Sequence, residues 1–278
     1  DNFRDLAAEI VEISQKNVKD VFGVLESFSV AATSYAIDSD SKWPFVTIPH
    51  FQQRGLTALS SSQAISLAYL PLVSEKQRET WEKYSATHQK WFRESYGPSI
   101  TVEPIQESIW YYNSTRRNLG AGGGCEEDDE QGRRSLKQMM PQEPGTGPYS
   151  PVWQLSPPPK ANDTKAINYN LFDKPVFKKA VDFVTYSRKP VFLDVCNQAK
   201  WFGIKSMGDT LQTVVVQPIF SDFSDDSIVV GHLVAVIPWA SFFENVLHPN
   251  AREINVVLEN NCDEVFSFEV KGYNATFL

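Results

Sequence analysis

Thr213-Val214-Val215-Val216 and, after a short polar loop, Ile228-Val229-Val230 are the stretches of sequence that decide the fold. Both runs are rich in β-branched residues and carry no charge, which predicts central strands buried on both faces of a sheet. Similar strand-like segments fill the second half of the chain, at residues 149–155, 190–195, 211–220, 228–237, 254–258 and 265–270. Two short helices are predicted between them, one near Pro175 and one opened by Pro238.

The first part of the chain is predicted to be helical. Residues 3–35 contain no Pro and a single Gly, and their apolar residues recur at helical spacing, which indicates one long helix. A second helix is predicted over residues 51–68, and a third begins at Ser74-x-x-Gln77, which forms a capping box. Because helices come first and antiparallel strands follow, the predicted fold class is α+β.

The long helix has two interpretations. It could lie against the domain that follows it in the sequence. Alternatively Phe3, Ile10, Asn17 and Val24, which repeat every seven residues, form the seam of a parallel homodimer in which Asn17 sets the register.

Composition excludes several classes of protein. With 278 residues, of which 42% are hydrophobic, the chain can bury one large core or two modest ones. A formal net charge of −8 argues against nucleic-acid binding, which requires clustered Lys and Arg. There is no apolar run of about 18 residues and no signal-peptide pattern. Since the sequence starts inside a helical pattern and stops just after a strand-like run, we expect membrane segments outside both ends.

No catalytic motif is present. The sequence lacks a nucleophile elbow, a zinc-protease helix and a phosphate-binding loop, and its four histidines are far apart. Cys125, Cys196 and Cys262 are odd in number and form no C-x-x-C pair, which argues against a metal knot and leaves their disulfide pairing open. We therefore expect no enzymatic activity, cofactor or metal in this chain.

Three sequons, at Asn113, Asn162 and Asn274, are candidate N-glycosylation sites of an extracellular glycoprotein. Residues 113–148 combine several glycines with a run of five acidic residues, which predicts a flexible surface insertion.

Aromatic residues gather near the predicted strand ends. Trp110, Tyr112, Tyr149 and Trp153, together with Gln154, could line a small-molecule pocket, in which apolar walls bury the ligand and a few polar groups orient it. The same residues could equally belong to a packed core.

Several stretches resemble CHASE-type extracellular sensor domains. They are Phe51-x-x-Arg54-Gly55, residues 67–73 with Arg78 and Trp81-Glu82, Tyr149-Ser150-Pro151-Val152 with Asn170-Leu171, Lys189-Pro190-Val191, and Gly231-His232-Leu233 followed by residues 241–247. Val46-Thr47-Ile48-Pro49 and residues 256–262 are most similar to ectodomains of diatom receptor-type nucleotide cyclases. Plant cytokinin receptor kinases are a more distant likeness.

This resemblance implies a transmembrane receptor with its sensor on the extracellular side of the plasma membrane. The parent protein would carry a cytoplasmic class III guanylate or adenylate cyclase, and signal transduction would pass through the stalk and a C-terminal transmembrane helix. The implied domains are a stalk helix (1–42), a membrane-distal PAS-like ligand-sensing domain (43–224, with 113–148 as the insertion) and a membrane-proximal PAS-like domain (225–278) that lacks its last strands.

The resemblance also implies a pocket for an extracellular small molecule or peptide. The candidate ligand-binding residues are Tyr149, Trp153, Gln154, Ser156, Leu193, Val216, Trp110 and Tyr112. Cytokinin receptors place an Asp where this chain has about Ser156 or Pro157, so cytokinin itself is not the expected ligand. Two alternatives remain open, a protein-interaction ectodomain without a small-molecule ligand and a secreted glycan-binding protein.

Overall fold

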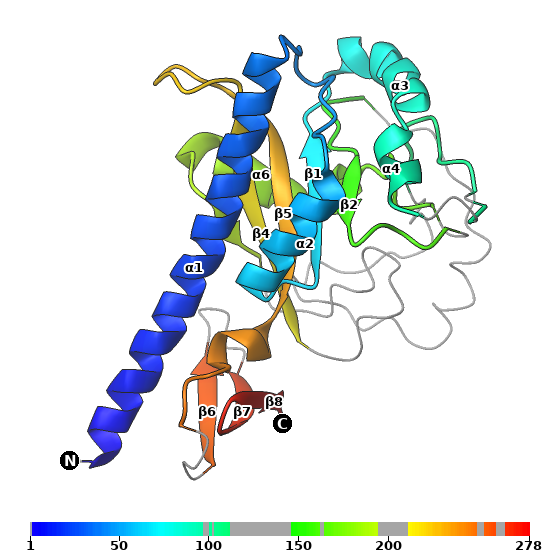
Figure 1. The fold of residues 1–278 in the computed structure, drawn as a ribbon. Coiled ribbons are helices and arrows are strands. Elements are labelled where there is room, and N and C mark those ends of the chain that lie inside the picture. Colours follow the sequence, from blue (N-terminus) through cyan, green and yellow to red (C-terminus); the bar gives the residue numbers. More distant parts are fainter. Residues whose placement is uncertain are drawn as a thin grey trace, which may run out of the picture.

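The computed structural model describes residues 2–96, 100–101, 103–111, 146–161, 164–193, 211–248, 253–259 and 265–278, without the side chains of residues 2 and 3. The chain is α+β, as predicted, with antiparallel sheets and one long N-terminal helix, α1 (Asn2–Asp38). Figure 1 shows α1 running along the whole length of the molecule, beside a larger upper unit and a smaller lower one.

The larger unit is built on a sheet of five strands, all antiparallel to their neighbours. Its strands are β1 (Ser66–Pro71), β2 (Gln154–Ser156), β3 (Val191–Phe192), β4 (Gln212–Phe220) and β5 (Val229–Pro238). They lie in the order β2-β1-β5-β4-β3. The two β-branched runs that predicted central strands are β4 and β5, and both are buried along nearly their whole length.

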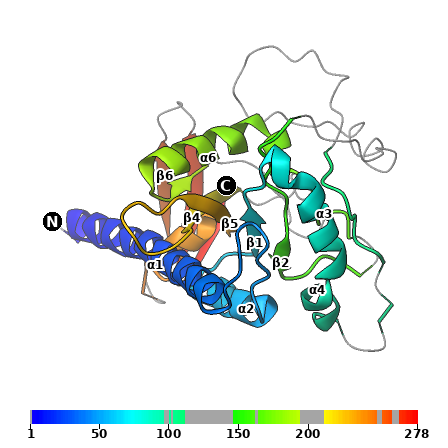
Figure 2. The same ribbon diagram turned by 90° about the horizontal axis from the view of Figure 1, so that it is seen from above.

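Helices cover both faces of this sheet. Figure 2 shows α1 and α2 (Phe51–Ser62) on one face and α6 (Pro175–Ser187) on the other. Four residues at helical spacing, Phe177, Ala180, Val181 and Val184, form the buried side of α6. The short 3₁₀ helix η1 (Glu75–Gln77) leads into α3 (Arg78–Thr87), and α3 and α4 (Lys90–Glu94) lie beyond β2.

The smaller unit is a three-stranded antiparallel sheet in the order β6-β7-β8. Its strands are β6 (Ile254–Glu259), β7 (Val265–Lys271) and β8 (Asn274–Phe277). The 3₁₀ helix η5 (Trp239–Phe243) follows β5 directly and joins the two units. A separate apolar core combines residues of α1, η5, the segment after η5 and β7: Ile10, Phe243, Val246, Leu247, Phe268 and Val270.

Helix α1 contributes to both cores. Val21, Leu25 and Phe28 are buried in the core of the larger unit, and Ile10 is buried in that of the smaller one. The stretch 1–42 that was expected to be a separate stalk is therefore partly an integral layer of the larger unit.

Two expectations about the fold are wrong, and a third, the short helix opened by Pro238, is confirmed only as a 3₁₀ helix. The helix predicted over 51–68 ends at Ser62, because Ser66–Pro71 is a strand buried at every position; a short apolar run does not distinguish the two from sequence alone. The helix opened by Pro238 is only η5. The boundary between 224 and 225 falls before β5, yet β5 pairs with both β1 and β4, so the larger unit extends through Pro238.

Candidate functional site

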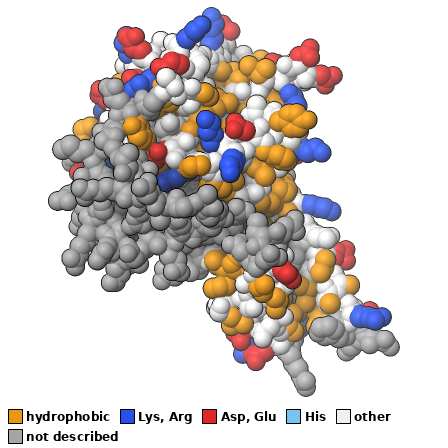
Figure 3. All heavy atoms as spheres, turned by 180° about the vertical axis from the view of Figure 1, so that it is seen from behind, with side chains coloured by type: hydrophobic (Ala, Val, Ile, Leu, Met, Phe, Trp, Pro, Cys, Tyr) orange, Lys and Arg blue, Asp and Glu red, His pale blue; other side chains and the backbone are white. Residues whose placement is uncertain are grey.

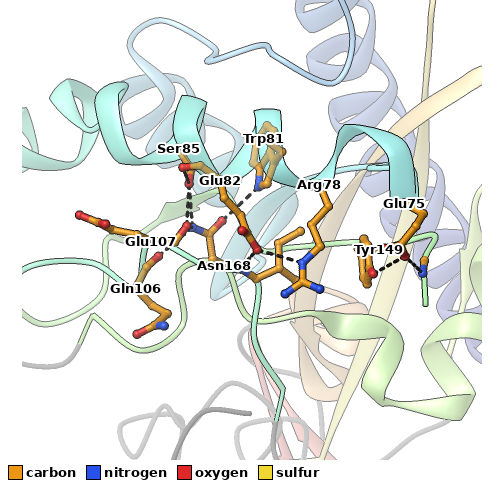
Figure 4. Close-up of polar contacts among 11 residues, drawn as sticks. Glu75, Arg78, Trp81, Glu82, Ser85, Gln106, Glu107, Tyr149 and Asn168 are labelled. Carbon is orange, nitrogen blue, oxygen red and sulfur yellow. Dashed lines mark hydrogen bonds and ion pairs between the residues drawn. The ribbon is translucent and has the colours of Figure 1, made fainter. Parts of the chain in front are cut away.

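A polar cluster joins α3 to three other segments of the larger unit (Figure 4). The predicted capping box is present, since Ser74 and Gln77 bond each other reciprocally at the start of η1. This fixes Glu75 in the first turn and places Arg78, Trp81, Glu82 and Ser85 at successive turns of one helix face.

Glu75 ties this helix start to the segment that carries Tyr149. Its Oε2 accepts hydrogen bonds of 2.5 Å from the Tyr149 hydroxyl and of 2.5 Å from the Gly147 backbone N–H. These two bonds hold the pKa of Glu75 below its ordinary value. Burial, and then the neighbouring Glu75 carboxylate, raise the pKa of Tyr149.

Arg78 and Glu82 form a half-buried ion pair one turn further along. The Nε of Arg78 donates to Oε1 of Glu82 over 3.1 Å, and the same oxygen accepts the Ile109 backbone N–H at 3.1 Å. The guanidinium carbon of Arg78 lies 5.7 Å from the ring centroid of Tyr149, within the range of a cation–π contact.

Asn168 completes the cluster. It has a positive φ of 60°, which Asn adopts more readily than most residues. Its Oδ1 accepts from Trp81 Nε1 at 3.3 Å, and its Nδ2 donates to Ser85 Oγ at 3.0 Å and to the Gln106 carbonyl at 2.7 Å. Since each of these groups is bonded within the chain, the cluster holds α3 in place.

Strand pairing separates the predicted pocket residues onto the two faces of the sheet. Ser156 lies against Gly55 of α2, so its side chain is on the α2 face. Residues paired directly across antiparallel strands have their side chains on the same face. The pairs Leu67↔Ser156, Leu67↔Ala235 and Val215↔Ala235 therefore place Val215 of β4 on the α2 face. Because neighbouring residues of a strand alternate, Val216 points to the opposite face, which α6 covers.

The remaining pocket residues follow the same division. Gln154 is two residues before Ser156 and lies on the α2 face, where its amide makes two bonds with the backbone of Ile48, at 2.7 and 3.0 Å. Val191 pairs with Val216, which places Leu193 at the end of β3 on the α6 face. The pocket that the resemblance implied therefore cannot contain all of these side chains at once.

The aromatic candidates are packed into the chain. Trp153 is 0% exposed; its ring lies 5.4 Å from that of Trp81, and its Nε1 donates to Thr47 Oγ1 at 3.1 Å. Trp110 is buried and donates from Nε1 to the Ile167 carbonyl. Tyr112 lies outside the described residues.

His232 is a polar residue that the sequence reasoning did not select. It lies on β5 opposite Leu70 on one side and Pro218 on the other, which puts it on the same sheet face as Val216. It is 0% exposed, and neither ring nitrogen has a hydrogen-bond partner in the described protein. Burial lowers its pKa to about 3. The sequence feature that could have identified it is a histidine inside an otherwise apolar strand.

The candidate dimer residues lie on two sides of α1. Ile10 is in the core of the smaller unit, and Asn17 donates from Nδ2 to the carbonyl of Phe242 at 3.1 Å. Val24 is half-buried and borders a groove between α1 and α2. The side chain of Phe3 is outside the described part of the chain.

Of the sequons, Asn274 is exposed at the start of β8, whereas Asn113 and Asn162 lie outside the described residues, as do all three cysteines. Among the helices that the structure describes, none is long and apolar enough to cross a bilayer. Within the same described ranges, no three His, Cys, Asp or Glu side chains are grouped as metal ligands would be.

No family model matches the chain, and no curated protein matches it.

Proposed function

We propose that this chain is the extracellular ligand-sensing domain of a transmembrane receptor that regulates a cytoplasmic class III nucleotide cyclase. The likeness to CHASE-type sensors supports this proposal. An antiparallel sheet in the order β2-β1-β5-β4-β3, with a long helix along one face, is the arrangement expected of a PAS-like sensing domain and also supports it. Fold alone does not assign function. Signalling is therefore inferred from how the larger and smaller units are connected.

The observation that carries the proposal is the double connection between the two units. Strand β5, the centre of the larger sheet, runs without a loop into η5. The carbonyls of Phe242 and Glu244, at the end of η5, accept hydrogen bonds from Asn17 on α1. A ligand that favours one arrangement of the sheet would therefore bias the position of α1 and of the smaller unit together.

The smaller unit is proposed to be the membrane-proximal, incomplete PAS-like domain. Figure 3 shows hydrophobic side chains on its surface. Val257, Val265, Phe277 and Leu278 are among the exposed large hydrophobic residues of its strands and of the chain end. Exposed apolar residues on a small sheet support the idea that further strands complete it.

The proposed homodimer would need a different seam from the one that the heptad spacing indicated. Ile10 is already buried in the core of the smaller unit of its own chain, and Asn17 is bonded to η5, which joins the two units. The groove of about 750 Å³ between α1 and α2, bordered by Gly23, Val24 and Thr57, is one accessible side of α1 and includes the heptad residue Val24. Sedimentation velocity at high concentration tests this part, because a strict monomer would argue against it.

Thermal unfolding of the purified chain in the presence of extracellular metabolites and short peptides tests ligand sensing. A ligand at 100 times its Kd stabilises the folded state by about 2.7 kcal/mol, which is a readily measured rise in Tm. Absence of any response across the library would remove the main support for sensing. The gene sequence beyond Leu278 provides an independent test, since a transmembrane helix followed by a cyclase domain is expected there.

A protein-interaction ectodomain is the second candidate. It is favoured by the complete burial of Trp153 and the internal bonding of Gln154 and Tyr149, which leave these side chains engaged within the chain. Such a module would respond to a partner ectodomain and to no small molecule in the same unfolding assay.

A further inference from the structure

The central strand of the larger sheet contains a buried imidazole whose hydrogen-bonding capacity is unused. Both Nδ1 and Nε2 of His232 lack a partner among the described residues, and the side chain is 0% exposed. Buried polar groups in proteins are nearly always bonded, because an unmade bond leaves the desolvation cost uncompensated. At this position in the middle of a sheet, a bound ligand would supply a partner that the described residues do not provide.

The described residues around His232 are apolar and uncharged. Leu70 and Pro218 lie opposite it on the neighbouring strands, and Val216 is two residues along β4 on the same face. The apolar side of α6, which includes Phe177 and Val181, belongs to the core above this face. Apolar walls with a single polar group of defined direction are typical of small-molecule sites.

The charge state of His232 limits what it can bind. With a pKa of about 3, the ring is neutral throughout the physiological range. A neutral imidazole offers one N–H donor and one acceptor nitrogen and has no net charge with which to attract an anion. Its complement is a group such as an alcohol, an amide or a carbonyl.

On the opposite, α2 face of the sheet, the predicted ligand-binding residues already have hydrogen-bond partners within the chain. Gln154 is already bonded to the backbone of Ile48, and Ser156 donates to the Gln52 carbonyl at 3.4 Å. Of the residues that the resemblance implied, Val216 and Leu193 share the α6 face with His232, while Gln154 and Ser156 do not.

We propose that His232 is the polar anchor of a ligand site between the α6 face of the sheet and α6, and that the ligand is an uncharged, largely apolar small molecule carrying a hydroxyl, amide or carbonyl group. This inference rests on the proposed sensing function and names the chemical class that the sensor takes. Anions and cations are excluded as ligands of this site because nothing described around His232 offsets their charge.

Tyr69 supplies a matched control. Its hydroxyl is also fully buried and without a partner in the described structure. Tyr69 pairs with Gln154 and Leu233, so it lies on the α2 face, opposite to His232. Tyr69→Phe therefore removes one buried unbonded polar atom from the same sheet without touching the proposed site.

The test compares three probes of the same shape: benzyl alcohol, benzoate and benzylammonium. Each is added to purified protein with ¹⁵N-labelled histidine, and the ring nitrogen shifts of His232 are assigned from their loss in His232→Leu. We expect benzyl alcohol, and not the two ions, to move these shifts and to raise Tm in the wild type and in Tyr69→Phe. We expect no rise of Tm in His232→Leu, whose own Tm without ligand is higher than that of the wild type.

His232→Gln, which keeps a donor and an acceptor, is expected to retain part of the response and serves if His232→Leu does not fold. Unchanged ring shifts with benzyl alcohol, or shifts that benzoate or benzylammonium reproduces, would overturn the inference. A rise of Tm in His232→Leu equal to that of the wild type would also overturn it, while leaving the sensing function itself supported by binding elsewhere. A lower Tm of the unliganded His232→Leu than of the wild type would assign the ring a structural role instead.

Discussion

Asn17 of α1 donates a hydrogen bond of 3.1 Å to the backbone carbonyl of Phe242, which lies in η5 between the two units. This polar contact connects a helix that contributes to both cores with the segment that joins them. It gives Asn17 a role inside one chain that differs from setting the register of a dimer.

Replacing Asn17 by Ala should weaken this connection and leave each core intact. We expect a loss of about 0.5–1.5 kcal/mol in the free energy of unfolding, the usual contribution of a neutral hydrogen bond. Lys16→Ala is the control, because Lys16 forms only an exposed ion pair with Asp20 at 2.9 Å. Urea unfolding measures both variants. A change in sedimentation behaviour of Asn17→Ala would instead favour the dimer seam.

Truncating Trp153 should mainly cost stability. Its ring is packed against Trp81 and Trp91, and we expect Trp153→Ala to lose about 3–5 kcal/mol in the free energy of unfolding. Trp153→Phe keeps most of the volume and should lose less. An unfolding free energy close to that of the wild type, combined with loss of ligand response, would identify Trp153 as a pocket residue.

Protonation of Glu75 at low pH should lower the free energy of unfolding. Its folded-state pKa is lowered by the bonds from Tyr149 and Gly147, so its contribution is complete above the unfolded-state pKa of about 4.3 and disappears as the pH falls through the lower folded-state value. We expect the urea midpoint of the wild type to fall more between pH 6 and pH 3 than that of Glu75→Gln. Equal pH dependence in both proteins would contradict this prediction.

Two helical glycines should respond to alanine with opposite signs. A Cβ on Gly55 of α2 would lie 2.6 Å from Ser156 Oγ and closer still to its Cβ, whereas a Cβ on Gly23 of α1 has nothing within 4 Å. Gly23→Ala should stabilise the protein by about 0.5–1 kcal/mol through helix propensity. Gly55→Ala should destabilise it by about 1–3 kcal/mol through overpacking.

Chemical denaturation of the two alanine variants measures the sign of each change in the free energy of unfolding. Ser156→Gly removes the side chain that Gly55→Ala meets, so the double variant should recover part of the loss. Absence of that recovery would mean that the loss in Gly55→Ala does not come from the contact with Ser156.

Much of the fold could be predicted from local sequence patterns. The unbroken helical spacing of residues 3–35 predicted α1, the pair Ser74 and Gln77 predicted the start of η1 and α3, and the two β-branched runs predicted β4 and β5. Strand β1 was missed because its six apolar or small residues lack the alternation that distinguishes a strand from a buried helix.

The candidate site was less predictable, because it depends on which distant strands pair. Nothing within residues 149–156 reveals that Gln154 and Ser156 face α2, since that follows from the register of β1 with β2 and β5. For the same reason His232 looked isolated in the sequence, although pairing brings it to the face of Val216. The burial of Trp153 has the same sequence signature in a core and in a pocket.

The contacts of α1 also restrict how this chain can change its length during evolution. Asn17 must face the end of η5 while Ser29, farther along the same helix, donates to the Pro218 carbonyl of β4 at 2.7 Å. One inserted or deleted residue between them would turn the two ends by about 100° relative to each other. Substitutions at the exposed positions of this part of α1 can accumulate, but insertions and deletions should be selected against.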